Sequence, residues 1–126
     1  MPNERDLFSD HIHIEELEIS AHIGVPEEER ANPQRLTVSI TLWPNRDTRD
    51  LRDQIDRTVN YSAVAEAAKN FVRDQSVNLI ETLADRLAMH LLGKFAVQKI
   101  MVELRKFVLP DAKHVSVTVT RSASVN

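Results

Sequence analysis

Apolar residues change their spacing along this chain in an order that restricts the fold. They recur every second residue in two early stretches, at helical spacing in two central stretches, and every second residue again in two late stretches. A period of two is typical of strands, and a period near 3.6 is typical of helices. Because strands and helices are grouped rather than alternating, this ββααββ order favours an α+β domain over a doubly wound parallel sheet.

We expect the strands at residues 11–23, 36–42, 100–104 and 115–119. In the first strand the period slips once near Glu15 and Glu16, which indicates a β-bulge. The second strand alternates with Thr and Ser and is therefore expected to be half-buried, and it ends at Pro44. Together the strands predict one four-stranded antiparallel sheet.

Two amphipathic helices are expected between the strand pairs. The first carries apolar residues at helical spacing over 64–72, with Asn60 as its cap. The second has a leucine or phenylalanine every fourth residue over 79–95, and Gly93 marks its end. Both should pack on one face of the sheet. Because this leaves two edges and a second face open, we expect several chains to close into an assembly.

Composition supports one globular domain of an ordinary kind. The 126 residues are 42% hydrophobic and 28% charged, enough to close a single core. We expect the domain at residues 11–122, after a mobile, polar arm at 1–10 and before a tail at 123–126. The absence of cysteine excludes disulfides and thiolate chemistry.

The chain also lacks the features of several partner classes. It has neither a signal-peptide pattern nor a membrane-length apolar run, so we expect a cytoplasmic protein that does not enter a membrane. A net charge of −3, with one Trp and one Tyr, argues against nucleic-acid binding. His11 and His13 share one side of a strand, but no third ligand accompanies them, and we assign no metal.

Four polar residues near the ends of expected elements are candidates for chemistry, and each also has an ordinary interpretation. Glu81 follows Asn78 by three residues and is compatible with a capping box. Tyr61, in the first turn of a helix, is compatible with simple packing. Glu29 belongs to a charged run that is compatible with a solvated loop.

Lys106 is the fourth candidate. It continues the inward phase of the third strand, where an apolar residue would be expected. The alternative is that the strand ends at Leu104 and the lysine extends into solvent. Residue types and spacing leave both interpretations open.

The joint order of these residues resembles the dihydroneopterin aldolase family, which cleaves a pterin side chain in folate biosynthesis. The resemblance covers roughly residues 12–121. It is carried by Ile23-Gly24-Val25 with Glu29, by Thr58-Val59-Asn60-Tyr61, by Val77-Asn78-Leu79-Ile80-Glu81, and by Val102-Glu103-Leu104-Arg105-Lys106.

The resemblance implies the tunnelling fold, in which four subunits close a β-barrel and two such rings stack into a homo-octamer. It implies an aldehyde-lyase that needs no cofactor and has active sites between subunits. The implied catalytic residues are Lys106, Glu29 and, from a neighbouring chain, Tyr61; the implied pterin-binding residues are Glu81, Ile80, Asn60 and Val59.

Two departures from the family pattern keep alternatives open. Counting back without gaps from residues 115–117 places Arg105 at the lysine position, and a loop shortened by one residue restores Lys106. We prefer Lys106, because a guanidinium stays protonated in proteins; Lys113 is a third candidate. The loop also lacks the Pro-Gly pair that follows the lysine in many aldolases. A related 2′-epimerase acting on dihydroneopterin or its triphosphate, and a non-catalytic pterin-binding protein, are therefore the alternative functions.

Overall fold

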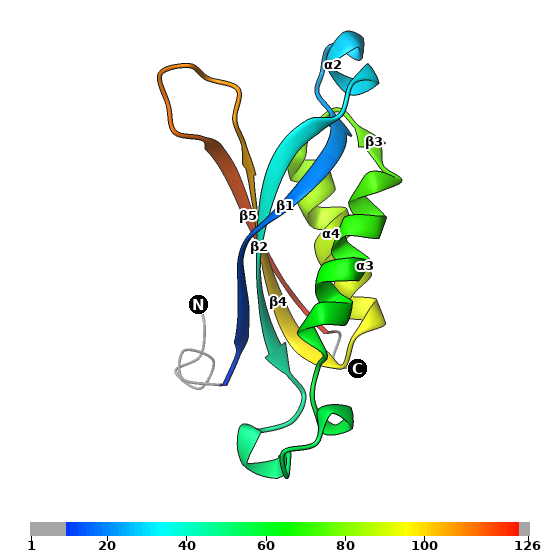
Figure 1. The fold of residues 1–126 in the computed structure, drawn as a ribbon, viewed down its shortest axis with the longest axis vertical. Coiled ribbons are helices and arrows are strands. Elements are labelled where there is room, and N and C mark those ends of the chain that lie inside the picture. Colours follow the sequence, from blue (N-terminus) through cyan, green and yellow to red (C-terminus); the bar gives the residue numbers. More distant parts are fainter. Residues whose placement is uncertain (1–9, 124–126) are drawn as a thin grey trace.

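The computed structural model describes residues 10–123. The elements are β1 (Ile12–Ile23), α2 (Glu27–Ala31), β2 (Gln34–Pro44), the 3-10 helices η1 (Thr48–Asp50) and η2 (Ile55–Arg57), α3 (Tyr61–Arg73), β3 (Ser76–Val77), α4 (Ile80–Lys94), β4 (Val97–Lys106) and β5 (Val115–Ser122). Figure 1 shows α3 and α4 side by side on one face of a twisted sheet. The expected α+β architecture is therefore confirmed.

The sheet has one strand more than the sequence predicts. Its order is β3-β1-β2-β4-β5, and β1, β2, β4 and β5 pair antiparallel. The two-residue β3 pairs parallel with the end of β1. The prediction of four strands, all antiparallel, was wrong in this detail, because two residues are too few to show any period.

The bulge in β1 occurs where the period slips. The register between β1 and β2 shifts between Ile14 and Leu17. Glu16 has a φ of 49°, a left-handed conformation, and its N–H donates to Ser39 Oγ at 3.0 Å. The predicted β-bulge is confirmed, and it turns the Glu16 side chain toward the face of the sheet opposite the helices.

The core lies between the sheet and the two helices. α3 packs mainly against β1, and α4 packs against β4 and β5. The largest fully buried side chains include Leu36, Ile40, Leu42, Leu83, Leu87, Leu91, Ile100 and Leu104. β2 is buried on both faces, since Thr37, Ser39 and Thr41 are only 2%, 6% and 5% exposed. The expected half-buried strand was wrong here, because polar side chains on β1 and β4 flank these hydroxyls.

The two main helices begin differently. Asn60 caps α3 as predicted, with Oδ1 accepting from the N–H groups of Ser62 and Ala63 at 3.0 and 3.3 Å. The N-cap of α4 is Leu79, which offers no side-chain hydrogen bond. Because Asn78 lies one residue before that cap, the capping-box interpretation of Asn78 and Glu81 was wrong. None of the helices in the described part is long and apolar enough to cross a membrane.

The N-terminal arm predicted at 1–10 lies outside the described residues except for Asp10. The Asp10 carboxylate accepts hydrogen bonds from the N–H and the hydroxyl of Thr48 at 3.0 and 2.7 Å. The start of the described chain is thus held against η1. Most of the predicted tail, residues 124–126, also lies outside the described part.

Candidate active site

Two of the candidate residues meet at the end of β4. Lys106 is the last residue of that strand and pairs in register with Leu36. Its side chain is 14% exposed, and its Nζ lies 3.3 Å from Oε1 of Glu29, whose side chain is 36% exposed. Lys106 therefore does not extend freely into solvent, and Glu29 is not simply part of a solvated charge run.

Glu29 reaches Lys106 because the chain makes a sharp turn after β1. Gly24 follows the strand with a φ of 140°, which residues with a side chain rarely adopt. A Cβ at Gly24 would lie 2.7 Å from both Cβ and Oε2 of Glu29. The glycine thus allows the glutamate to pack directly on the backbone that leaves β1, with its carboxylate next to Lys106.

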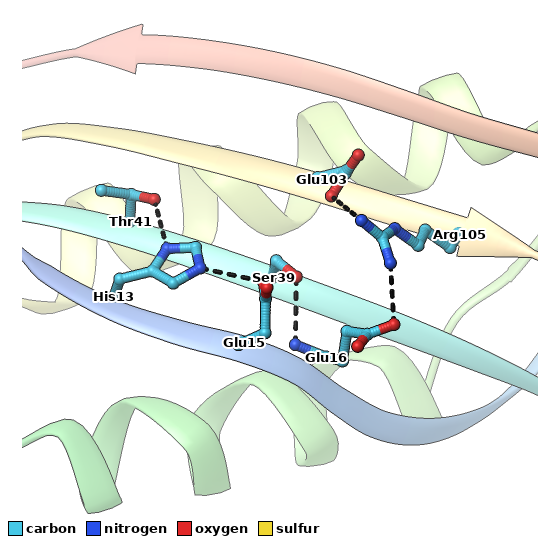
Figure 2. A network of polar contacts seen from close by, with 7 residues as sticks. All are labelled: His13, Glu15, Glu16, Ser39, Thr41, Glu103 and Arg105. Carbon is cyan, nitrogen blue, oxygen red and sulfur yellow. Dashed lines mark hydrogen bonds and ion pairs between the residues drawn. The ribbon is translucent and has the colours of Figure 1, made fainter.

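Arg105 points to the opposite side of the sheet from Lys106, because side chains alternate along a strand. Its Nη1 lies 2.7 Å from Glu16 Oε1, and its Nη2 lies 3.3 Å from Glu103 Oε1. Figure 2 shows the guanidinium between these two carboxylates. Lys113 is exposed in the loop between β4 and β5. Of these three cationic residues, Lys106 is the one that contacts Glu29.

The helix-free face carries further polar contacts (Figure 2). His13 Nδ1 lies 2.8 Å from Thr41 Oγ1, and His13 Nε2 lies 3.0 Å from Glu15 Oε1. Ser39 Oγ donates to the same Glu15 oxygen at 3.1 Å. The hydrogen bond from His13, followed by that from Ser39, lowers the pKa of Glu15. Within residues 10–123, no three His, Cys, Asp or Glu side chains are grouped closely enough to hold a metal.

The segment Val77–Glu81, which carries the candidate pterin anchor Glu81, adjoins the Gly24 turn. The N–H of Gly24 donates to the carbonyl of Val77 at 3.2 Å. Three residues further on, α4 begins with buried Ile80 and exposed Glu81. An open cleft beside this segment is lined by Val25, Ser76, Val77, Asn78, Leu79, Thr82 and Arg86. The motif Ile23-Gly24-Val25 and the Val77–Glu81 segment therefore meet through a backbone hydrogen bond.

The motif Thr58-Val59-Asn60-Tyr61 lies away from this contact within one chain. Tyr61 is 60% exposed at the start of α3, Asn60 caps the helix, and Val59 is buried. α3 has 13 residues and is thus about 20 Å long. Figure 1 shows its start and α2 at opposite ends of the sheet. The structure does not bring Tyr61 to Lys106 and Glu29 of the same chain.

Two residues that sequence reasoning missed hold the turn in place. Arg30 Nη1 donates to the carbonyls of Gly24 and Val25 at 2.8 and 2.6 Å. Gln34 Nε2 donates to the carbonyls of Ile23 and Glu29 at 2.5 and 3.0 Å. The sequence offered only a general indication of these bonds: backbone carbonyls in a sharp, partly buried turn need hydrogen-bond donors, but nothing in the sequence identifies which side chains donate.

The family model described as dihydroneopterin aldolase matches residues 12–120 of this chain. The chain belongs to the dihydroneopterin aldolase family. As a member of this family the protein is an aldolase, and hence a lyase, and the resemblance read from the motifs is confirmed.

Individual members show the same relationship. The chain is 33% identical over 122 residues to the dihydroneopterin aldolase of Bacillus subtilis, covering 91% of this chain and 99% of that protein. The crystal structure of the Escherichia coli dihydroneopterin aldolase in complex with neopterin superposes with a TM-score of 0.83 at 27% identity, covering 90% of this chain and 99% of that chain. A dihydroneopterin triphosphate 2′-epimerase of Pseudomonas aeruginosa is 28% identical over 109 residues, covering 85% of this chain and 88% of that protein.

Proposed function

We propose that the protein cleaves 7,8-dihydroneopterin into 6-hydroxymethyl-7,8-dihydropterin and glycolaldehyde, as a cytoplasmic enzyme of folate biosynthesis. The observation that carries this proposal is the 3.3 Å contact between Lys106 Nζ and Glu29 Oε1, next to the turn bonded to Val77. It joins an amine and a carboxylate beside the segment that leads to Glu81. The related E. coli aldolase, which was crystallised with neopterin, supports the substrate class.

The chemistry is a retro-aldol reaction that uses the substrate's own electron sink. Removal of the 2′-hydroxyl proton forms the aldehyde carbonyl as the C1′–C2′ bond breaks. The released electron pair moves through C6 to N5 of the conjugated imine. Return of a proton to C1′ then completes the hydroxymethyl product. No cofactor or Schiff base is needed, so a general acid–base group is sufficient.

Lys106 is the group that we assign to this proton transfer, acting through a water molecule. Its side chain is largely buried, and the Glu29 carboxylate fixes the position of its amino group. Tyr61 of a neighbouring chain completes the catalytic set and helps to orient the substrate side chain.

Glu81 is the proposed anchor of the pterin ring. Its carboxylate can accept two parallel hydrogen bonds, one from the ring N–H and one from the exocyclic amine. It lies in the first turn of α4 and is exposed, so the carboxylate is accessible to a ligand. The backbone at Ile80, together with Val59 and Asn60 from the neighbour, lines the rest of the pocket.

A shared site requires an assembly, and we propose a tetrameric ring with the tunnelling-fold barrel, doubled into an octamer. Two observations support it. Within residues 10–123, β1 is joined to β3 only at His22 and Ile23, so the rest of that edge and the outer edge of β5 are unpaired. Within one chain, α3 also begins with Tyr61 at the opposite end of the sheet from α2, which carries Glu29 (Figure 1).

Incubation of purified protein with 7,8-dihydroneopterin tests the reaction. Both 6-hydroxymethyl-7,8-dihydropterin and 7,8-dihydromonapterin are followed by chromatography. We expect Lys106→Ala to reduce turnover sharply while pterin binding is retained, and the exposed Lys113→Ala to serve as the matched control. Loss of activity in Arg105→Ala with full activity in Lys106→Ala would move the catalytic assignment to Arg105.

Two physical measurements test the binding site and the assembly. Glu81→Ala should weaken pterin binding by more than about 2 kcal/mol, the scale for removing a charged acceptor from buried donors. Unchanged affinity by calorimetry would remove Glu81 from the site. Sedimentation at micromolar protein should show a tetramer or an octamer, and a fully active monomer would contradict the shared site.

The second candidate function is the 2′-epimerase, which recaptures the aldehyde and inverts C2′. Two observations favour keeping it: the P. aeruginosa epimerase relative, and Phe107-Val108 in place of a Pro-Gly pair after Lys106. The same incubation separates the functions. Dihydromonapterin alone would indicate an epimerase, whereas pterin binding without either product would indicate a non-catalytic binding protein.

A further inference from the structure

Glu29 stands on a short element that has little means of fixing its own position. α2 has five residues, and Pro26 at its N-cap offers no side-chain hydrogen bond. A helix of this length is not stable by itself, because few backbone bonds form for the residues that are ordered. Contacts outside α2 must therefore hold the Glu29 carboxylate next to Lys106.

Arg30, the next residue, ties α2 back to the end of β1 from two directions. Its Nη1 donates to the carbonyls of Gly24 and Val25 at 2.8 and 2.6 Å. Its own carbonyl accepts from Nδ1 of His22 at 2.9 Å. The side chain and the backbone of one residue thus bridge the strand end and the helix.

Gly24, whose carbonyl accepts a hydrogen bond from Arg30, is also the residue against which Glu29 packs. Glu29 packs against Gly24 so closely that a Cβ there would lie 2.7 Å from Glu29 Cβ. Gly24 is bonded in turn to Val77, next to the segment that leads into α4. A shift of the Gly24 carbonyl would therefore move the support beneath the Glu29 carboxylate.

We infer that Arg30 is a positioning residue, which acts through the Gly24 and Val25 carbonyls to hold Glu29 against Lys106. The inference rests on the proposed function, since it concerns the same catalytic pair. It extends that function by assigning a role to a side chain that need not touch the substrate. Arginine suits this role, because its planar guanidinium presents donors in a rigid arrangement, whereas lysine presents a mobile point charge.

The test is a comparison of kcat and KM among variants. Arg30→Met should lower kcat about tenfold or more, because displacement of a catalytic group by about 1 Å has effects of that size. KM for dihydroneopterin should stay within about twofold, since the Glu81 anchor is unchanged. Arg30→Lys, which can still reach one carbonyl, should recover part of kcat. Arg73→Met, on an exposed residue in the last turn of α3, is the matched control and should keep wild-type activity.

A double variant separates positioning from general destabilisation. In a Glu29→Gln background, Arg30→Met should lower kcat by less than it does in the wild type, since the pair it serves is already impaired. If Arg30→Met lowered kcat by the same factor in both backgrounds, or raised KM without changing kcat, the inference would be overturned.

The crystal structure of Arg30→Met, or of Arg30→Lys if the first variant does not fold, supplies an independent readout. The distance from Lys106 Nζ to Glu29 should exceed about 4 Å, the limit of an ion pair; an unchanged distance would overturn the inference. An inactive wild-type protein would instead refute the proposed function, and the crystallographic distance would still decide the positioning role.

Discussion

Replacement of Gly24 by alanine tests how the site is held together. A methyl group at this position would lie 2.7 Å from Glu29 Cβ, while ordinary van der Waals contact begins near 3.4 Å. The two backbones must therefore separate by about 0.7 Å, because rotation of the Glu29 side chain cannot move its Cβ. The φ of 140° adds strain of about 1–3 kcal/mol for a residue with a side chain.

Both consequences can be measured. A displacement of this size would carry Glu29 Oε1, now 3.3 Å from Lys106 Nζ, to the limit of an ion pair. We expect kcat for dihydroneopterin cleavage to fall about ten- to a hundredfold. The free energy of unfolding, measured by urea denaturation, should fall by about 1–3 kcal/mol, the strain that the folded state must accept.

Gly93→Ala is the matched control, since Gly93 and Gly24 are the two glycines of the chain. Gly93 lies within α4, and nothing is within 4 Å of a Cβ there. Its replacement should stabilise the protein by about 0.5–1 kcal/mol through helix propensity, with kcat unchanged. If Gly24→Ala matched Gly93→Ala in both stability and kcat, the packing argument for Glu29 would be refuted.

Three further predictions concern other parts of the fold. The hydrogen bond from Arg49 lowers the pKa of Asp47 from 3.8 to about 2. The pairing therefore stabilises the fold above pH 3.8, and this stabilisation is lost as the pH falls through about 2. Carbon NMR titration of Arg49→Met should show that the pKa of Asp47 rises. Leu87→Ala, at a fully buried position of α4, should lower the free energy of unfolding by about 2–5 kcal/mol in urea denaturation, and a loss below 1 kcal/mol would contradict its core position. Asn60→Ala should lower the free energy of unfolding by about 1 kcal/mol in the same assay, because it removes the cap of α3, whereas Asn70→Ala, at an exposed position in the last turn of that helix, should not lower it.

Elements with several repeats of a period could be predicted, and those without could not. The alternation over 36–42 and the leucine spacing over 79–95 each repeat often enough to identify a strand and a helix. β3 and α2 have two and five residues, too few for any period to show. The burial of Ser39 also depends on which strands flank β2, and local sequence does not state that.

The candidate site could likewise be predicted only in part from the sequence. Motif order pointed to Lys106 and Glu29, and the inward phase of β4 placed the lysine on the helix side of the sheet. The contact between them depends on a turn whose path is set by Gly24 and by hydrogen bonds from Arg30. The acceptors of those hydrogen bonds are backbone carbonyls, which every residue carries, so no residue pattern predicts which carbonyls accept.

Because Arg105 and Lys106 point to opposite sides of the sheet, the register of β4 decides which of the two cations faces Glu29. These neighbours belong to two different environments, one facing Glu29 and the other facing Glu16 and Glu103. Insertion of one residue between Ile100 and Leu104 would place a guanidinium beside Glu29 and turn the amine to the far face, since side chains alternate. A length change in the loop after Lys106 leaves that alternation intact. A change in loop length alone would therefore leave Lys106 facing Glu29, whereas a change of one residue within β4 would not.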